Sequence, residues 1–135
     1  MSPSGRQGAL DALEAARPLL ARLDVAGHPE DVAADLIEGW SAVETALRSL
    51  IGGSTLSGQA LVRELRQREI LSLDTGHALL EFLSARDRVQ RTTYRPAGID
   101  VAAARSAFAR LDAELRAPAP AASAVAANAG SVAGA

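Results

Sequence analysis

Two charged residues interrupt apolar stripes of the sequence and are the first candidates for chemistry. Glu44 lies seven residues after Ile37 and seven before Ile51, so a helix would turn its carboxylate toward the apolar side. Arg86 takes the corresponding place on a later apolar stripe. Because burying an isolated charge costs on the order of several kcal/mol, we predict that Glu44 and Arg86 form an ion pair between two helices. This pair would either fix the packing register at the edge of the core or belong to a functional cleft.

A second candidate site is the basic run that begins at Arg86. Its other candidate contact residues are Asp87, Arg88, Arg91, Tyr94 and Arg95. One aromatic ring among guanidinium groups can stack on an RNA base, contact a protein partner, or simply lie on a solvated surface. Upstream, residues 24–44 hold six acids and no Arg. The opposite charges of the two stretches indicate either solvated helix faces or complementary patches that orient a homodimer or another protein partner.

Composition excludes several classes of chemistry. The 135-residue chain has 14 cationic side chains, all of them Arg, and it has no Lys and no Cys. Without Lys there is no Walker phosphate loop and no Schiff-base lysine, and without Cys there is no disulfide, thiol nucleophile or Cys-bound zinc. The net charge of −2 argues against general nucleic-acid binding. His28 and His77 fall at expected helix starts, so we predict surface positions for both, no metal site and no cofactor.

The two ends of the sequence predict a cytoplasmic protein without membrane insertion. Residues 1–7 lack the apolar core of a signal peptide. Residues 117–135 form a long charge-free run, but they are mostly Ala, Gly, Ser and Pro. Pro118 and Pro120 also oppose a helix in this run. We therefore expect a flexible tail there rather than a membrane span.

The spacing of apolar residues predicts helices along the whole domain. Pro18 lies inside the first of them, which predicts a kink or a late start near Arg17. Gly52 and Gly53 are expected to end the second helix, and aspartates are the expected N-caps of the last two. The expected helices span residues 9–25, 29–51, 57–70, 74–91 and 100–116.

The connections between these helices are short, which favours antiparallel packing. The predicted fold class is all-α, an antiparallel bundle of four long helices plus one short helix over residues 9–116. Residues 1–8 are expected to be a flexible N-terminus and residues 117–135 a flexible tail.

Two segments carry a resemblance to a known family. Residues 40–50 read WSAVETALRSL and residues 79–87 read LLEFLSARD, and a turn and a last helix opened by Asp100 follow. This arrangement resembles the HEPN superfamily of small helical bundles and covers residues 31–115. The resemblance implies the bundle fold and a dimer. Active members of the family are metal-independent ribonucleases that use an Arg, a following polar residue and a His roughly four to six positions after the Arg, in a site formed across the dimer.

The sequence departs from that pattern at the residue that carries catalysis. Arg86 and Asp87 match the first two positions, but the window that follows reads Gln90, Arg91 and Thr92 and contains no His. Proton transfer near neutral pH normally uses an imidazole. We therefore predict a non-catalytic, HEPN-like interaction module that dimerises or docks on a protein partner. Two alternatives stay open: an RNA-binding or ribonuclease-type protein that uses Arg86 and Asp87, and an accessory subunit tethered to a larger assembly by its tail.

Overall fold

A computed structural model describes residues 3–23, 27–91 and 95–117 of the chain. Every secondary-structure element in these ranges is a helix, which confirms the predicted all-α bundle. The elements are α1 (Pro3–Ala15), α2 (Arg17–Leu23), α3 (Pro29–Leu50), α4 (Gly58–Gln67), α5 (Leu73–Arg91) and α6 (Gly98–Arg116).

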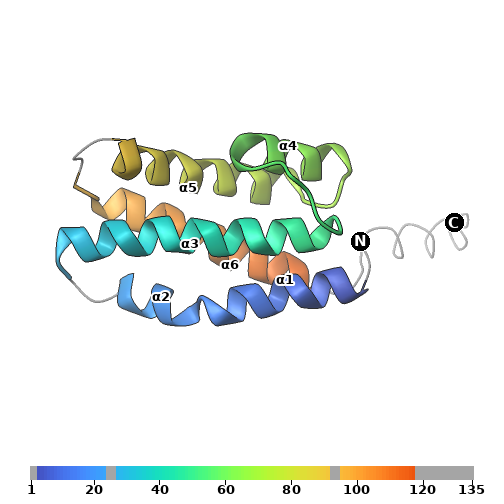
Figure 1. The fold of residues 1–135 in the computed structure, drawn as a ribbon, viewed down its shortest axis with the longest axis horizontal. Coiled ribbons are helices and arrows are strands. Elements are labelled where there is room, and N and C mark those ends of the chain that lie inside the picture. Colours follow the sequence, from blue (N-terminus) through green and yellow to red (C-terminus); the bar gives the residue numbers. More distant parts are fainter. Residues whose placement is uncertain (1–2, 24–26, 92–94, 118–135) are drawn as a thin grey trace, which may run out of the picture.

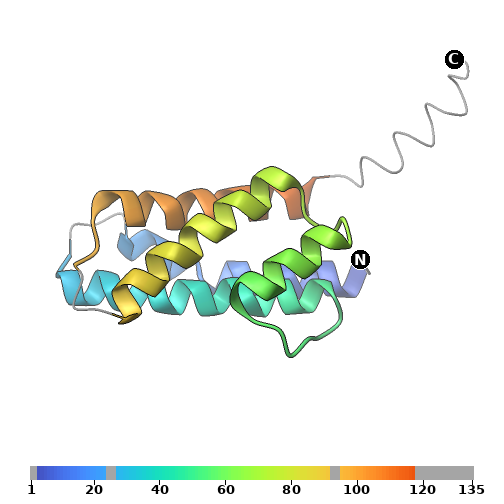
Figure 2. The same cartoon turned by 90° about the horizontal axis from the view of Figure 1, so that it is seen from above.

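The helices form an antiparallel four-helix bundle in which neighbouring positions run in opposite directions. α1 and α2, one after the other, occupy one position, and α3, α5 and α6 occupy the other three (Figure 1). α3 packs against α1, α2 and α5, while α6 packs against α5 and α1. Figure 2 shows α5 crossing obliquely between α6 and α3. The short helix α4 lies in the connection from α3 to α5 and packs against both.

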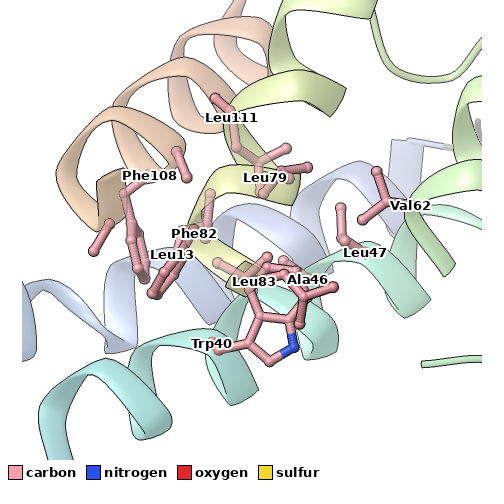
Figure 3. Packing of buried hydrophobic residues seen from close by; sticks show 14 of the residues in the cluster. Leu13, Trp40, Ala46, Leu47, Val62, Leu79, Phe82, Leu83, Phe108 and Leu111 are labelled. Carbon is pink, nitrogen blue, oxygen red and sulfur yellow. The ribbon is translucent and has the colours of Figure 1, made fainter. Parts of the chain in front are cut away.

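One hydrophobic core receives side chains from all six helices. Its aromatic centre joins three of them. Trp40 of α3 meets Phe82 of α5 edge-on with ring centroids 5.4 Å apart, and Phe82 lies 6.0 Å from the ring of Phe108 on α6. Figure 3 shows these rings among the surrounding aliphatic side chains. Each such aromatic pair adds about 0.5–1.5 kcal/mol beyond the area it buries, so α3, α5 and α6 are firmly joined at this level.

The first expected helix is present as two helices. α1 ends at Ala15 and α2 begins at Arg17, because Pro18 has no N–H to continue the α-helical ladder. The carbonyl of Ala16 accepts the N–H groups of Leu19 and Leu20 at 3.0 and 3.3 Å, which closes the first turn of α2. The helix is therefore interrupted at the predicted position, and α2 begins at Arg17, but the late start of the first helix is wrong because α1 already begins at Pro3.

The beginning of α1 corrects the predicted domain boundary at residue 9. The helix starts at Pro3, and its first turns pack on the bundle. Gly8 lies so close to Ser49 that an added Cβ would come within 3.3 Å of the Ser49 Oγ. Arg6 donates from Nε to the carbonyl of Leu115 at 2.5 Å and from its terminal nitrogen to the carbonyl of Ala117. These contacts hold residues 3–8 by polar groups and close packing, which an apolar pattern does not reveal. Of the expected tail, residues 118–135 lie outside the described residues.

The helix starts differ by one or two residues from the expected caps. α5 begins at Leu73, and the Ser72 Oγ accepts the Thr75 N–H at 3.2 Å, so Ser72 caps the helix in place of the expected Asp74. α6 begins at Gly98, and Asp100 accepts the Ala97 N–H at 2.9 Å from inside the first turn. Ser72 acts as the expected caps would, by accepting an N–H of the first turn, whereas Asp100 reaches back from the first turn to the N–H of the N-cap residue Ala97, as the acid of a capping box does.

Candidate functional site

Glu44 lies at the junction of α3 with α4. Its side chain is 14% exposed, so the expected position at the edge of the core is correct. One carboxylate oxygen accepts the indole N–H of Trp40 and the backbone N–H of Gly58, both at 2.7 Å. The other accepts a guanidinium N–H of Arg48 at 3.0 Å. Three donors from the same corner of the fold therefore satisfy this carboxylate.

Arg86 is occupied on its own helix, and the predicted Glu44–Arg86 ion pair is wrong. One terminal nitrogen of Arg86 donates to the side-chain oxygen of Gln90 at 2.5 Å, and the other lies 3.2 Å from the Asp87 carboxylate. The Arg86 Nε is buried and has no hydrogen-bond partner among the described residues. Helical periodicity correctly predicted that both charged side chains face the core. It does not show which donor lies nearest to the Glu44 carboxylate. For Glu44 the nearer donors were Trp40 and Arg48, one turn away on α3.

In the basic run after Arg86, one Arg forms an ion pair within the fold and two others are exposed on the surface. Arg88 donates to the carboxylate of Asp100 at 2.5 Å, and Asp100 is 0% exposed. This contact joins the end of α5 to the start of α6. Arg91 and Arg95 are exposed, whereas Tyr94 lies outside the described residues. The Arg88–Asp100 pair was not predicted, because it depends on how the connection from α5 folds back.

One acid of the acidic stretch, residues 24–44, also forms an ion pair within the fold. Arg22 of α2 donates to both carboxylate oxygens of the buried Asp35 on α3, at 3.2 and 3.0 Å. The hydrogen bond to Asp35 raises the pKa of the Arg22 guanidinium above its ordinary value, and the charges of Glu38 and Asp31 act in the same direction. Asp35 of α3 therefore pairs with Arg22 of α2, and the charges of two further acids of α3 act on the same guanidinium, an arrangement that the sequence pattern did not reveal.

A pocket of about 630 Å³ opens between α2 and α3 beside this ion pair. Its described lining residues are Ala21, Arg22, Gly27, Asp31, Val32, Ala34 and Asp35. Small and apolar side chains supply the walls, and the ion pair of Arg22 with Asp35 and the carboxylate of Asp31 supply the polar rim.

Large apolar side chains are exposed at both ends of the bundle. Ile99, in the first turn of α6, is 72% exposed, and Leu73, in the first turn of α5, is 61% exposed. Figures 1 and 2 place the end of α2 and the start of α3 at the same end of the bundle as the end of α5 and the start of α6. We call this the charged end. Its defining residues are Arg22, Asp31, Asp35, Glu38, Arg88, Arg91, Arg95, Ile99 and Asp100.

A smaller polar depression of about 180 Å³ lies on the outer side of α5 and α6. It is lined by Asp74, His77, Ala78, Glu81, Ser106 and Arg110. His77 and His28 are both exposed, as expected. Within the described ranges, no three His, Asp or Glu side chains are grouped as a metal site would need. None of the described helices is long and apolar enough to cross a membrane.

Comparison of the sequence and the fold with known proteins gives no relative from which a function could be transferred. No protein-family model matches the chain, and no curated protein and no solved structure is significantly similar to it.

Proposed function

We propose that this chain is a non-catalytic helical module that binds a protein through its charged end. The observation that carries the proposal is the exposure of Ile99, 72%, beside surface charges of both signs. An exposed apolar side chain with polar and charged groups around it has the arrangement of a small interface, in which an apolar centre is enclosed by a polar rim. The proposal includes a cytoplasmic location, in keeping with a sequence that has no Cys for a disulfide framework.

The environment of Arg86 supports a non-catalytic role. Its guanidinium group is held by Gln90 and Asp87 on the same helix, and Asp87 is the polar residue that the HEPN resemblance would place in a ribonuclease site. No His follows Arg86 on α5. A degenerate HEPN-like bundle that keeps the fold and lacks the proton-transfer group fits these observations.

RNA binding is the second candidate function, and the exposure of Arg91 and Arg95 is the observation that favours it. Guanidinium groups on a surface attract phosphates, and such binding weakens steeply as salt rises. The third alternative, a subunit tethered by its tail, depends on residues 118–135, which lie outside the described ranges.

Site-specific photo-crosslinking in cells separates these functions. A photoreactive phenylalanine analogue replaces Ile99 in the full chain, and the matched control places the same analogue at Leu73, the other exposed apolar side chain of a first helical turn. We expect a crosslinked product of higher mass at position 99 that protease removes and nuclease does not, and a much weaker product at position 73. A nuclease-sensitive product would favour RNA binding instead, and the absence of any protein product at position 99 would contradict the proposal.

A further inference from the structure

The polar depression between α5 and α6 is lined by charged groups of both signs that the fold does not use. Asp74, His77 and Glu81 line it from α5, and Ser106 and Arg110 line it from α6. All five side chains are exposed to solvent. Among the described residues, none of the five has a hydrogen bond or an ion pair with another group. The carboxylates and the guanidinium group of the depression are therefore free to bind a ligand.

Two other ion pairs show what opposite charges of this bundle do when they reach each other. Arg22 is bound to Asp35 beside the larger pocket, and Arg116 is bound to Asp112 on α6 itself. In the depression, the opposite charges instead face a space of about 180 Å³. Ordinary ligand pockets measure roughly 300–1,000 Å³, so this smaller space admits a molecule of about the size of one amino acid.

The packing of α5 on α6 sets the order of the charges along the depression. Thr75 donates to Glu114 across the two antiparallel helices, so Arg110, one turn before Glu114, lies opposite the second turn of α5. Asp74 lies about one turn nearer the start of α5, and Glu81 lies less than one turn farther along it. The two acids are about 10 Å apart along the helix axis at about 1.5 Å per residue. One cation is therefore flanked by a carboxylate on either side.

This order is the inverse of the charges of a basic amino acid. Lysine has one carboxylate and two ammonium groups, and its extended side chain separates the ammonium groups by more than one helical turn. We infer that the depression binds a free basic α-amino acid, with its carboxylate on Arg110 and Ser106 and its cationic groups at Asp74 and Glu81. A guanidinium group suits a carboxylate because it donates two parallel hydrogen bonds. With His77 neutral, the site also has one negative charge in excess, which matches the net positive charge of the ligand.

This site is separate from the charged end. It uses the first half of α5 and the second half of α6, whereas the charged end lies where α5 ends and α6 begins. The inference therefore goes beyond the proposed function and does not depend on it. A failure of the amino-acid site leaves the proposed function standing, and the crosslinking at position 99 does not test this site.

The first test is a titration of the full chain, labelled with ¹⁵N, with L-lysine at low salt. The amide signals of residues 74–81 and 106–110 report binding at the site. Exposed ion pairs are weak, so we expect saturation at these residues with a dissociation constant of about 1 mM, rising with ionic strength. If no saturable change occurs at these residues by about 20 mM lysine, the inference is overturned.

The second test combines ligand analogues with variants. Norleucine lacks the side-chain ammonium group of lysine, and cadaverine lacks its carboxylate. Each should bind the parent at least about threefold more weakly than lysine, as the loss of an exposed ion pair implies. Arg110→Gln should remove the preference for lysine over cadaverine. One of Asp74→Asn and Glu81→Gln should remove the preference for lysine over norleucine, and preferences that persist in all three variants overturn the inference.

The matched controls are Arg63→Gln and Glu69→Gln. Both residues are exposed, lie outside the depression and have no ion pair with any other described residue. They change the net charge as Arg110→Gln and Glu81→Gln do, and circular dichroism checks that all variants keep their helices. We expect the controls to bind lysine as the parent does. Equal weakening in the controls and the site variants would mean that lysine responds only to overall charge, which overturns the inference.

Discussion

Glu44 acts as a cap for a helix other than its own. The backbone N–H of Gly58 belongs to the first residue of α4, and it donates to the Glu44 carboxylate at 2.7 Å. Ser57, the N-cap residue of α4, makes no capping hydrogen bond with its own side chain. The negative charge lies at the positive end of the α4 dipole, so this carboxylate fixes where α4 begins relative to α3.

The first prediction concerns the loss of this carboxylate. Glu44→Ala removes the acceptor of the Trp40 indole and of the Gly58 N–H, and a partly buried donor without a partner costs about 1–3 kcal/mol. We expect the free energy of unfolding, measured in urea, to fall by that amount. Glu44→Gln keeps an amide oxygen for these donors and should lose less.

The partner of Glu44 is tested by double-mutant cycles. Arg48 contacts the Glu44 carboxylate at 3.0 Å, so Glu44→Ala and Arg48→Ala should show a coupling energy clearly above measurement error. Glu44→Ala and Arg86→Ala should be additive within about 0.5 kcal/mol, because their side chains bind different groups. A larger coupling with Arg86 than with Arg48 would restore the ion pair that the sequence predicted.

At the scale of the element, the sequence predicted where helices lie better than where they begin. Apolar periodicity and the Gly52–Gly53 pair predict the bounds of α3 to within one residue. Both its buried face and its C-terminal end depend on residues close together in the sequence. The start of α5 was placed at Asp74, whereas Ser72 caps it with help from α6. Glu114 of α6 accepts both the backbone N–H and the hydroxyl of Ser72, at 3.0 and 2.8 Å. Both Ser72 and Asp74 can cap a helix, and the contact with Glu114, 42 residues away in the sequence, favours Ser72. A local sequence pattern cannot show such a contact.

The second prediction concerns the contact of α1 with the end of α6. Arg6 satisfies the carbonyls of Leu115 and Ala117, which lie where the helix has no N–H of its own to offer. Arg6→Ala should lower the free energy of unfolding by about 1 kcal/mol and speed amide hydrogen exchange in the last turn of α6. Gln7→Ala is the matched control, because Gln7 bonds only to Asp11 within α1. Equal exchange in the two variants would show that Arg6 does not hold α6.

At the scale of the whole molecule, the fold class was accessible from the sequence and the charged end was not. A 3.6-residue apolar period with short connections determines an antiparallel bundle almost alone. The charged end depends on two ion pairs that each span a connection between helices, Arg22 with Asp35 and Arg88 with Asp100. The sequence did show stretches of opposite sign. Only the folded chain shows that they lie at one end, together with Ile99 and a pocket.

The last prediction follows from the continuity of the core through all six helices. α4 is short, yet it contributes Leu61, Val62 and Leu65 to the same core as the aromatic centre, and Glu44 joins its first residue to Trp40. Trp40 is the single Trp of the chain, so its fluorescence reports this junction while far-ultraviolet circular dichroism reports all the helices. We expect the two signals to give one coincident urea transition, as small single domains do. A fluorescence change at lower urea than the loss of helix would show that the α3–α4 junction opens before the bundle. It would also mean that α4 is carried by the bundle without contributing to its cooperativity.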